Sequence, residues 1–338
     1  MSRQTLIGII ITFIMAAIGI GTWSCEDAPK IPKESLVKVT ISTLPYSFTG
    51  YSIFLALEKG YFKEQGLDVI LKTSYPHGKA TLNAVLTGET DFGVSSETPF
   101  IHAVLKGDKL YAFAVMITAE NHLAVVARKD KGVLNPKDLI NKTIGVTLGS
   151  NGEYFLDTVL LLHNIPREKV KMVHLKPKLM VAALKNGEVD AIATWNPQMY
   201  KARKELGEQG AVFTAEGLYS PYFIIAAGQD NVHAKPEIIE RVVRSLVKAS
   251  HYIREFPDES RKVVAGHLKT DESLLKEISA TYRFKIILDQ SFLLTLESQS
   301  RWAMKKKLTV QTTLPNYLDF IYSGALLAVE PKNMTIIQ

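Results

Sequence analysis

Apolar and polar positions follow two patterns through most of the chain. Short apolar runs bounded by glycine or polar residues predict buried strands, and apolar residues three or four positions apart predict helices. Strands are expected at Val37–Ser42, Leu67–Leu71, Phe92–Ser95, Leu110–Val115, Leu123–Ala127, Thr143–Thr147, Val170–Leu175, Ala191–Thr194 and Tyr222–Ala227. Helices are expected at Tyr51–Lys59, Lys79–Leu86, Pro99–Leu105, Glu153–His163, Leu179–Lys185, Pro197–Leu206, Pro236–Phe256, Glu259–Leu268, Glu272–Thr281, Gln290–Lys306 and Leu314–Ser323. Strands that alternate with helices favour an α/β fold with mainly parallel sheets.

One stretch of this pattern occurs twice. Gly88 to Pro99 reads G-E-T-D-F-G-V-S-S-E-T-P, and Gly187 to Pro197 reads G-E-V-D-A-I-A-T-W-N-P. In each copy a helix precedes the glycine, an apolar strand follows it, and a polar loop opens the next helix. Thr98 and Asn196 are expected as helix caps, with the prolines at the first helical position. Matching strand–helix units before each copy therefore predict two similar lobes.

The repeat also predicts domain boundaries. The first lobe is expected to comprise residues 36–128 and 222–338, and the second residues 129–221. The chain is then expected to cross between the lobes near Ala127–Lys129 and Tyr222–Ala227. The helices after residue 236 show no further strand–helix repeat, so they are expected to cover the first lobe.

Composition excludes several classes of function. The 338 residues are 46% hydrophobic and 22% charged, which is typical of a globular protein, and the net charge is +6. The absence of long basic blocks argues against a nucleic-acid partner. No H-E-x-x-H pair, G-x-S-x-G elbow or P-loop occurs, and the histidines are scattered. We therefore expect no catalytic residues, no metal site and no cofactor.

Polar loops that follow strands and open helices are the candidate binding site. Ligands of open α/β sheets bind beyond the carboxyl ends of the strands, and helix N-termini attract anions. The candidate ligand-binding residues are Pro45, Tyr46, Tyr51, Ser95, Ser96, Glu97, Thr98, Ser150, Asn151, Tyr154, Trp195 and Asn196. Local alternatives exist, because Ser150 with Glu153 also fits a capping box, Glu97 a solvated charge and Trp195 a core position.

The N-terminus has the layout of a targeting segment. Arg3 precedes the apolar run Leu6–Ile20, and small and polar residues lead to Cys25, the only cysteine. Ser24–Cys25 resembles a lipobox, which implies cleavage before Cys25 and lipidation there; an uncleaved anchor helix is the alternative. Residues 26–35 are expected to form a tether, so the rest of the chain is expected outside the cytoplasmic membrane, tethered to it.

Several short motifs, in this order and spacing, resemble the substrate-binding proteins of bacterial ABC transporters for nitrate, sulfonates and taurine, which include binders of thiamine-precursor pyrimidines. The motifs are Lys59-Gly60-Tyr61-Phe62, Gly66-Leu67-Asp68-Val69, both G-E-x-D stretches, and Trp195 with Pro197. The resemblance extends over about Leu36 to Ser323. It implies a two-lobed type II periplasmic-binding-protein fold, a small ligand held between the lobes, an ABC permease as partner, a monomer and no catalysis. Many members carry Asp where Asn196 stands, which argues against a taurine-like zwitterion.

The sequence therefore suggests an extracytoplasmic receptor that captures a small anionic or polar molecule and delivers it to a permease. The alternative within the family is a binder of a heterocyclic or aromatic ligand, favoured by Tyr46, Tyr51, Tyr154 and Trp195. A pyrimidine-synthase-like enzyme on the same fold is less favoured, because those enzymes work in the cytoplasm and use a cysteine-rich motif.

Overall fold

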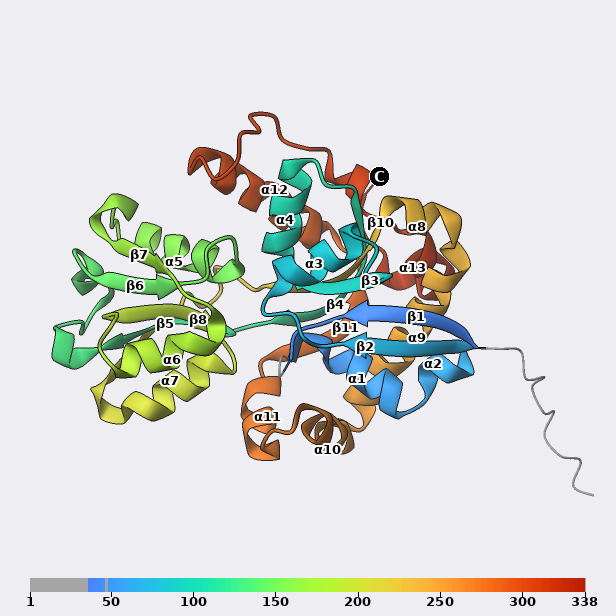
Figure 1. The fold of residues 1–338 in the computed structure, drawn as a ribbon, viewed down its shortest axis with the longest axis horizontal. Helices are drawn as coiled ribbons and strands as arrows, with labels where there is room; N and C mark the ends of the chain where they lie inside the picture. The colour runs from blue at the N-terminus through green and yellow to red at the C-terminus, as the bar shows by residue number, and fades with distance from the viewer. Residues whose placement is uncertain (1–35, 46–47, 338) are drawn as a thin grey trace, which may run out of the picture. The chain divides into compact units, whose positions relative to one another are not determined.

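The computed structural model describes residues 36–45 and 48–337, which form two lobes with one β-sheet each (Figure 1). The strands are β1 (Val37–Ser42), β2 (Leu67–Lys72), β3 (Phe92–Ser96), β4 (Leu110–Ala119), β5 (Leu123–Arg128), β6 (Thr143–Val146), β7 (Lys171–His174), β8 (Ala191–Trp195), β9 (Gly210–Phe213), β10 (Tyr222–Gly228) and β11 (Tyr282–Ile287). The targeting segment, Cys25 and Tyr46 lie outside the described residues.

Helices cover both sheets. They are α1 (Tyr51–Glu58), α2 (Tyr61–Glu64), α3 (Gly78–Leu86), α4 (Glu97–Lys106), α5 (Asn151–Leu162), α6 (Pro177–Lys185), α7 (Gln198–Leu206), α8 (Gln229–Ala234), α9 (Pro236–Glu255), α10 (Pro257–Leu268), α11 (Glu272–Ser279), α12 (Gln290–Lys305) and α13 (Gly324–Val329). Short 3-10 helices lie at Phe48–Gly50, Lys129–Lys131, Pro136–Leu139, Arg167–Lys169, Gly207–Gln209, Tyr317–Phe320 and Pro331–Asn333. None of these described helices is long and apolar enough to cross a bilayer.

The two sheets share the arrangement of five strands, and the first has β11 as a sixth strand at one edge. The first has the strand order β11-β4-β10-β3-β1-β2, and the second has the order β7-β6-β8-β5-β9. In the first, β1 lies between β2 and β3 and is parallel to both; in the second, β6 is likewise parallel to β7 and β8. An antiparallel strand follows in each case, β10 beside β3 and β5 beside β8. The predicted two-lobed α/β fold is confirmed, and both sheets are mixed rather than mainly parallel because the strands that follow each crossing run antiparallel.

The position of β5 corrects the predicted lobe boundary. β5 pairs with β8 and β9 in the second sheet, whereas the sequence analysis assigns Leu123–Ala127 to the first lobe. The chain therefore crosses at residues 120–122 and not near Ala127–Lys129. The return crossing directly precedes Tyr222, since β10 lies wholly in the first sheet. It is therefore close to the crossing predicted near Tyr222–Ala227.

Elements after residue 207 contain the main errors of the sequence analysis. β9, β11, α8 and α13 are not predicted, and the predicted helix Leu314–Ser323 is wrong. Only the 3-10 helix Tyr317–Phe320 forms there, because Ile321 pairs with Ala112 and leaves no room for a longer helix. β11 has a clear alternation, with Tyr282, Phe284 and Ile286 buried between exposed residues.

Each lobe has its own apolar core. In the first lobe, α1, α4, α9 and α12 pack on the sheet around large buried side chains such as Phe54, Phe100 and Phe292. In the second lobe, α5 covers one face of the sheet and α6 and α7 cover the other (Figure 1). The fully buried apolar residues of the described chain form separate clusters in the two lobes, and partly buried aromatic side chains such as Tyr200 of α7 contact the opposite lobe.

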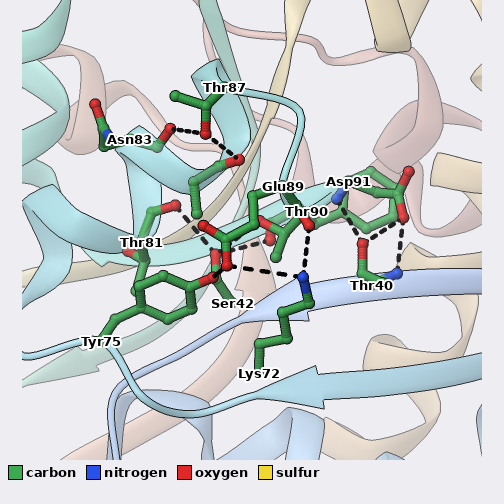
Figure 2. Close-up of polar contacts among 12 residues, drawn as sticks. Thr40, Ser42, Lys72, Tyr75, Thr81, Asn83, Thr87, Glu89, Thr90 and Asp91 are labelled. Atoms are coloured by element: carbon green, nitrogen blue, oxygen red, sulfur yellow. Dashed lines mark hydrogen bonds and ion pairs between the residues drawn. The ribbon is translucent and has the colours of Figure 1, made fainter.

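The G-E-x-D repeat has a structural cause. Gly88 and Gly187 have φ angles of 71° and 73°, a left-handed conformation that glycine adopts without strain and that ends the preceding helices. Asp91 accepts hydrogen bonds from the backbone N and Oγ1 of Thr40, each at 2.7 Å (Figure 2). Asp190 accepts one from the backbone N of Thr143 at 2.8 Å. In both lobes the aspartate thus ties the start of the third repeat strand to the first.

Candidate functional site

A cavity of about 440 Å³ lies between the lobes; we call it the cleft cavity. Its walls come from the start of α3 and from Pro99 in the first lobe, and from three strand-end loops in the second. The lining residues are His77, Gly78, Lys79, Ala80, Asn83, Pro99, Thr147, Leu148, Gly149, Ser150, Asn151, His174 and Trp195. A volume of this size suits a small organic ligand.

The first turn of α3 forms the wall on the side of the first lobe. His77 is the N-cap, and its Nδ1 accepts a hydrogen bond from the backbone N of Ala80 at 3.3 Å. Gly78 lies directly on the end of β3: a Cβ at this position would be 2.3 Å from Oγ of Ser95. Only glycine fits there, so the backbone at the helix start lies on the strand end and borders the cavity.

The first turn of α5 forms the opposing wall. Ser150 is the N-cap, and its Oγ accepts from the backbone N of Gly152 at 3.1 Å. Glu153 accepts from the backbone N of Gly149 at 2.7 Å. The predicted capping box is therefore present in a modified form, in which the glutamate holds the loop before the cap. Two helix N-termini, one from each lobe, thus border one cavity, and each offers N–H groups that have no partner within the helix.

Basic side chains from both lobes border the same cavity. Lys79 comes from α3, and His174 from the end of β7. Burial is the main cause that lowers the pKa of His77, and the nearby charges of Lys79 and Lys176 lower it further. His174 also holds the opposing loop, because its Nδ1 accepts from the backbone N of Leu148 at 3.2 Å. The cavity is therefore suited to a negatively charged or hydrogen-bond-accepting group.

Trp195 forms an aromatic part of the wall. It ends β8 and is half-buried, with its ring against the start of α5; a Cβ at Gly152 would be 3.2 Å from Cζ3 of the indole. The ring also packs partly on the core of the second lobe. The two alternatives for this residue, ligand wall and core, are thus both partly realised.

Three of the predicted ligand residues, Ser150, Asn151 and Trp195, line the cleft cavity. Ser95 lies behind Gly78 and is buried, and Ser96 is the N-cap of α4. Pro45 is exposed and does not line the cleft cavity.

The predicted helix caps are wrong. α4 begins at Glu97, so Thr98 lies inside the helix, where its Oγ1 donates to Oε1 of Gln299 at 2.6 Å. α7 begins at Gln198 after Pro197. Asn196 is buried and continues the pairing of β8 instead, since its backbone N donates to the carbonyl of His122 at 3.1 Å.

Glu97 is neither a solvated charge nor part of the cavity wall. Its carboxylate is completely buried and accepts hydrogen bonds from the hydroxyl of Tyr219, from Nε2 of Gln299 at 2.8 Å and from the backbone N of Tyr222 at 3.0 Å. Burial raises its pKa, although these donors act in the opposite direction. Glu97 therefore joins α4 and α12 to the returning crossing.

The two predicted tyrosines of the described chain also lie away from the cavity. Tyr51 is buried in the core of the first lobe, with its ring centroid 4.5 Å from that of Phe284, and burial raises its pKa to about 12. Tyr154 lies between the lobes, with its ring centroid 4.9 Å from that of Tyr219 and 5.1 Å from that of Trp302.

The sequence analysis missed the wall contributed by α3 and by His174. Both follow the second strand of a repeat unit: Tyr75-Pro76-His77-Gly78 comes after β2, and His174 ends β7. The rule that polar strand-end loops open helices applies to these loops too, so the signal was present. Among residues 36–45 and 48–337, no group of three or more His, Cys, Asp or Glu side chains is placed to hold a metal.

Sequence comparison matches residues 48–260 to the family described as NMT1/THI5 like. YtlA of Bacillus subtilis, whose name is that of a binding protein without a stated ligand, is 26% identical over 71% of this chain and 72% of its own. The taurine-binding periplasmic protein of Escherichia coli is 24% identical over 59% and 61% of the two chains. The formylaminopyrimidine-binding protein of Halalkalibacterium halodurans is 24% identical over 75% of this chain and 77% of its own.

Solved structures share the fold. The alkanesulfonate-binding protein SsuA of Xanthomonas axonopodis pv. citri, bound to MOPS, superposes with a TM-score of 0.75 at 18% identity, covering 85% of this chain and 99% of that one. The desulfurization enzyme DSZB superposes with a TM-score of 0.62 at 14% identity, covering 88% and 99%. Binding proteins and an enzyme therefore share this architecture.

Proposed function

Because this chain belongs to the NMT1/THI5-like family, we propose that it is an extracytoplasmic solute-binding receptor of an ABC import system. It captures a small anionic or polar molecule of the sulfonate type in the cleft cavity and delivers it to a membrane permease. The observation that carries this proposal is the pair of helix N-termini, α3 and α5, that border one cavity together with Lys79, His77 and His174.

Ligand capture is proposed to close the lobes about the two crossings. A ligand held by both α3 and α5 contacts both lobes only when they are together, so binding favours the closed arrangement. Ser150 and Asn151 provide polar contacts from the second lobe, and Trp195 covers the apolar part of the ligand. Ser95 and Asn196, each next to the wall, carry buried side-chain oxygens that no described residue satisfies, so they add hydrogen-bonding capacity beside the site.

The chain is proposed to bind its ligand without converting it. The named ligands of the taurine-binding and formylaminopyrimidine-binding relatives support binding, whereas DSZB shows that the fold also serves an enzyme. Mass spectrometry of a bound ligand after prolonged incubation with the protein distinguishes the two: unchanged ligand supports a receptor, and stoichiometric or catalytic conversion contradicts it.

A thermal-shift screen of the full-length protein tests the ligand class. Alkanesulfonates and taurine are expected to raise the melting temperature, since a ligand at a hundred times its Kd adds about 2.7 kcal/mol to the free energy of unfolding. Lys79→Ala should weaken binding of an alkanesulfonate about fivefold, the equivalent of about 1 kcal/mol for one charge-assisted contact in a partly exposed position. Lys262→Ala, which removes an equal charge from α10, is the matched control. Equal loss in both variants, or no stabilisation by any anion, contradicts the proposal.

The second candidate is a heterocyclic ligand, which Trp195 in the wall and the formylaminopyrimidine-binding relative favour. Including an aminopyrimidine in the same screen decides between the two: stabilisation by the pyrimidine alone, unaffected by Lys79→Ala, supports this second candidate.

Attachment to the membrane through Cys25 is proposed from the sequence alone. Membrane fractions should contain the protein, and Cys25→Ser should release it or leave it unprocessed. Mass spectrometry that finds the intact Met1 start with unmodified Cys25 contradicts lipidation and favours an uncleaved anchor.

A further inference from the structure

A second cavity, which we call the side cavity, adjoins the cleft cavity. It has a volume of about 730 Å³. The two cavities share five lining residues, namely Lys79, Asn83, Pro99, Leu148 and Gly149. Its remaining walls come from α3 and α4 of the first lobe, from the start of α5 and Arg167 of the second, and from residues 307–310 after α12. The two cavities therefore lie on either side of Lys79 and Leu148, where a molecule that occupies both would pass.

The side cavity has an apolar wall, most of which belongs to the first lobe. The apolar lining residues are Leu82, Leu86, Pro99, Ala103, Leu105, Leu148, Leu308 and Val310. Leu86 and Leu308 are each 37% exposed, and Val310 is 99% exposed. Three large apolar side chains from two separate segments thus present surface to the same space. Exposed apolar side chains that are grouped in this way mark binding sites, whereas singly scattered ones do not.

The charged groups of this cavity are largely paired or lie at its edge. Arg167 pairs with both Glu153 and Asp157, so the guanidinium and the Glu153 carboxylate compensate each other. Lys106 pairs with Asp108 at 3.7 Å. Burial lowers the pKa of His102, which favours the neutral ring. Lys307 also lines the side cavity and has no ion pair among the described residues. Lys79, at the start of α3, is the charged residue that lines both cavities.

This inference rests on the proposed function. We propose that the natural ligand is an amphiphilic anion, with its charged head in the cleft cavity and an alkyl or aryl tail in the side cavity against Leu86, Leu308 and Val310. Nitrate and taurine have no such tail, and each would leave the side cavity unfilled. The geometry thus assigns residues 307–310, a segment outside both repeats, to ligand selection.

Titration calorimetry of the full-length protein with methanesulfonate, butanesulfonate and octanesulfonate tests the assignment. Each methylene that enters the side cavity should tighten binding threefold to fourfold, which corresponds to about 0.8 kcal/mol per buried methylene. Methanesulfonate binding without any dependence on chain length overturns the tail assignment and leaves the proposed function standing. No binding of any of the three overturns both.

Variants of the side cavity locate the tail. Leu86→Ser and Val310→Ser should bind methanesulfonate as the unaltered protein does, and should bind octanesulfonate at least fivefold more weakly. Leu161→Ser is the matched control, because Leu161 is 77% exposed on α5 and lines neither cavity. Val310 is almost fully exposed, so its replacement leaves folding intact. An unchanged preference for octanesulfonate in both variants places the tail elsewhere and overturns the proposal.

Discussion

His122 is a buried histidine that the protein holds in its neutral form. It lies at the first crossing, with Nδ1 2.6 Å from the hydroxyl oxygen of Tyr282, and its ring packs edge-on against Phe223. Nε2 has no hydrogen-bond partner among the described residues. Burial lowers the pKa of His122 to about 3, because desolvation disfavours the charged imidazole.

The free energy of unfolding should therefore fall in mild acid. Below pH 6.5 the unfolded chain binds a proton at His122 that the folded chain does not, so stability is lost at about 1.4 kcal/mol per pH unit, or about 2 kcal/mol at pH 5. Urea unfolding at pH 7 and pH 5 measures this loss. In His122→Phe the difference in free energy of unfolding between pH 7 and pH 5 should be smaller by about 2 kcal/mol than in the unaltered protein. This holds whatever the stability of the variant at pH 7.

A comparison of the two proteins is needed because Glu97 acts in the opposite direction. Its pKa is raised, so protonation of Glu97 favours the folded state as the pH falls. Glu97 contributes equally to both proteins, and the difference between them isolates His122. An identical pH dependence in His122→Phe and the unaltered protein would show that the ring is not the source of acid sensitivity.

Substitution of Trp195 distinguishes between its two roles, as a wall of the ligand cavity and as part of the core of the second lobe. The ring borders the cleft cavity and also contacts Gly152 and the core of the second lobe. Trp195→Ala should weaken ligand binding by about 2 kcal/mol, as expected for a buried aromatic contact. Calorimetry gives the affinity and thermal unfolding gives the stability. A melting temperature lowered by many degrees with unchanged affinity assigns the ring to the core.

At the scale of elements, the repeated aspartates should have equal roles. Asp91→Ala and Asp190→Ala each leave the backbone N–H of the neighbouring strand, at Thr40 or Thr143, without its acceptor. Each should lower the free energy of unfolding by about 1–3 kcal/mol. Glu188→Ala is the control, because this exposed side chain lies in the same turn and, among the described residues, bonds Asn186 alone. A destabilisation by Glu188→Ala as large as that by Asp190→Ala would contradict the assignment.

The elements that the sequence predicts well are those within the repeat. Helix-ending glycines, apolar strands and the strand–helix order are local signals, and they place β1, β3, β6 and β8 within a residue or two. Helix starts after β3 and β8 are predicted less well. The competing interactions there are distant in sequence: Thr98 bonds Gln299, and Asn196 bonds the carbonyl of His122. A capping preference is too weak to prevail over such contacts.

The errors in assigning strands to lobes have a different origin. β5 is an apolar run that fits either sheet, and only its pairing with β8 assigns it to the second lobe. The candidate ligand residues likewise fall into two groups, those that the repeat places correctly and those whose position depends on distant contacts. Ser150, Asn151 and Trp195 belong to strand-end loops of the repeat and line the cavity, whereas Tyr51 has a sequence environment that does not distinguish the core from a surface.

At the scale of the whole described chain, the two lobes are joined by two crossings and by side-chain contacts, among them those between α12 and α5. Trp302 on α12 donates from Nε1 to Oδ2 of Asp157 at 2.8 Å, and its ring contacts Tyr154 edge-on. Asp157 also pairs with Arg167 within the second lobe. The loss of the indole donor therefore removes a contact between lobes while Asp157 keeps a partner in its own lobe.

Trp302→Phe should shift the ligand-free protein towards an open arrangement. It retains the aromatic contact with Tyr154 but removes one hydrogen bond to a carboxylate, worth about 1 kcal/mol, and the fraction of closed protein falls accordingly. Small-angle scattering should then give a larger radius of gyration for the ligand-free variant, and calorimetry an affinity about fivefold weaker. Tyr252→Phe is the matched control, since its hydroxyl bonds Lys59 and Glu259 within the first lobe alone. If Trp302→Phe and Tyr252→Phe have the same radius and affinity as the unaltered protein, the contact between α12 and α5 does not control closure of the lobes.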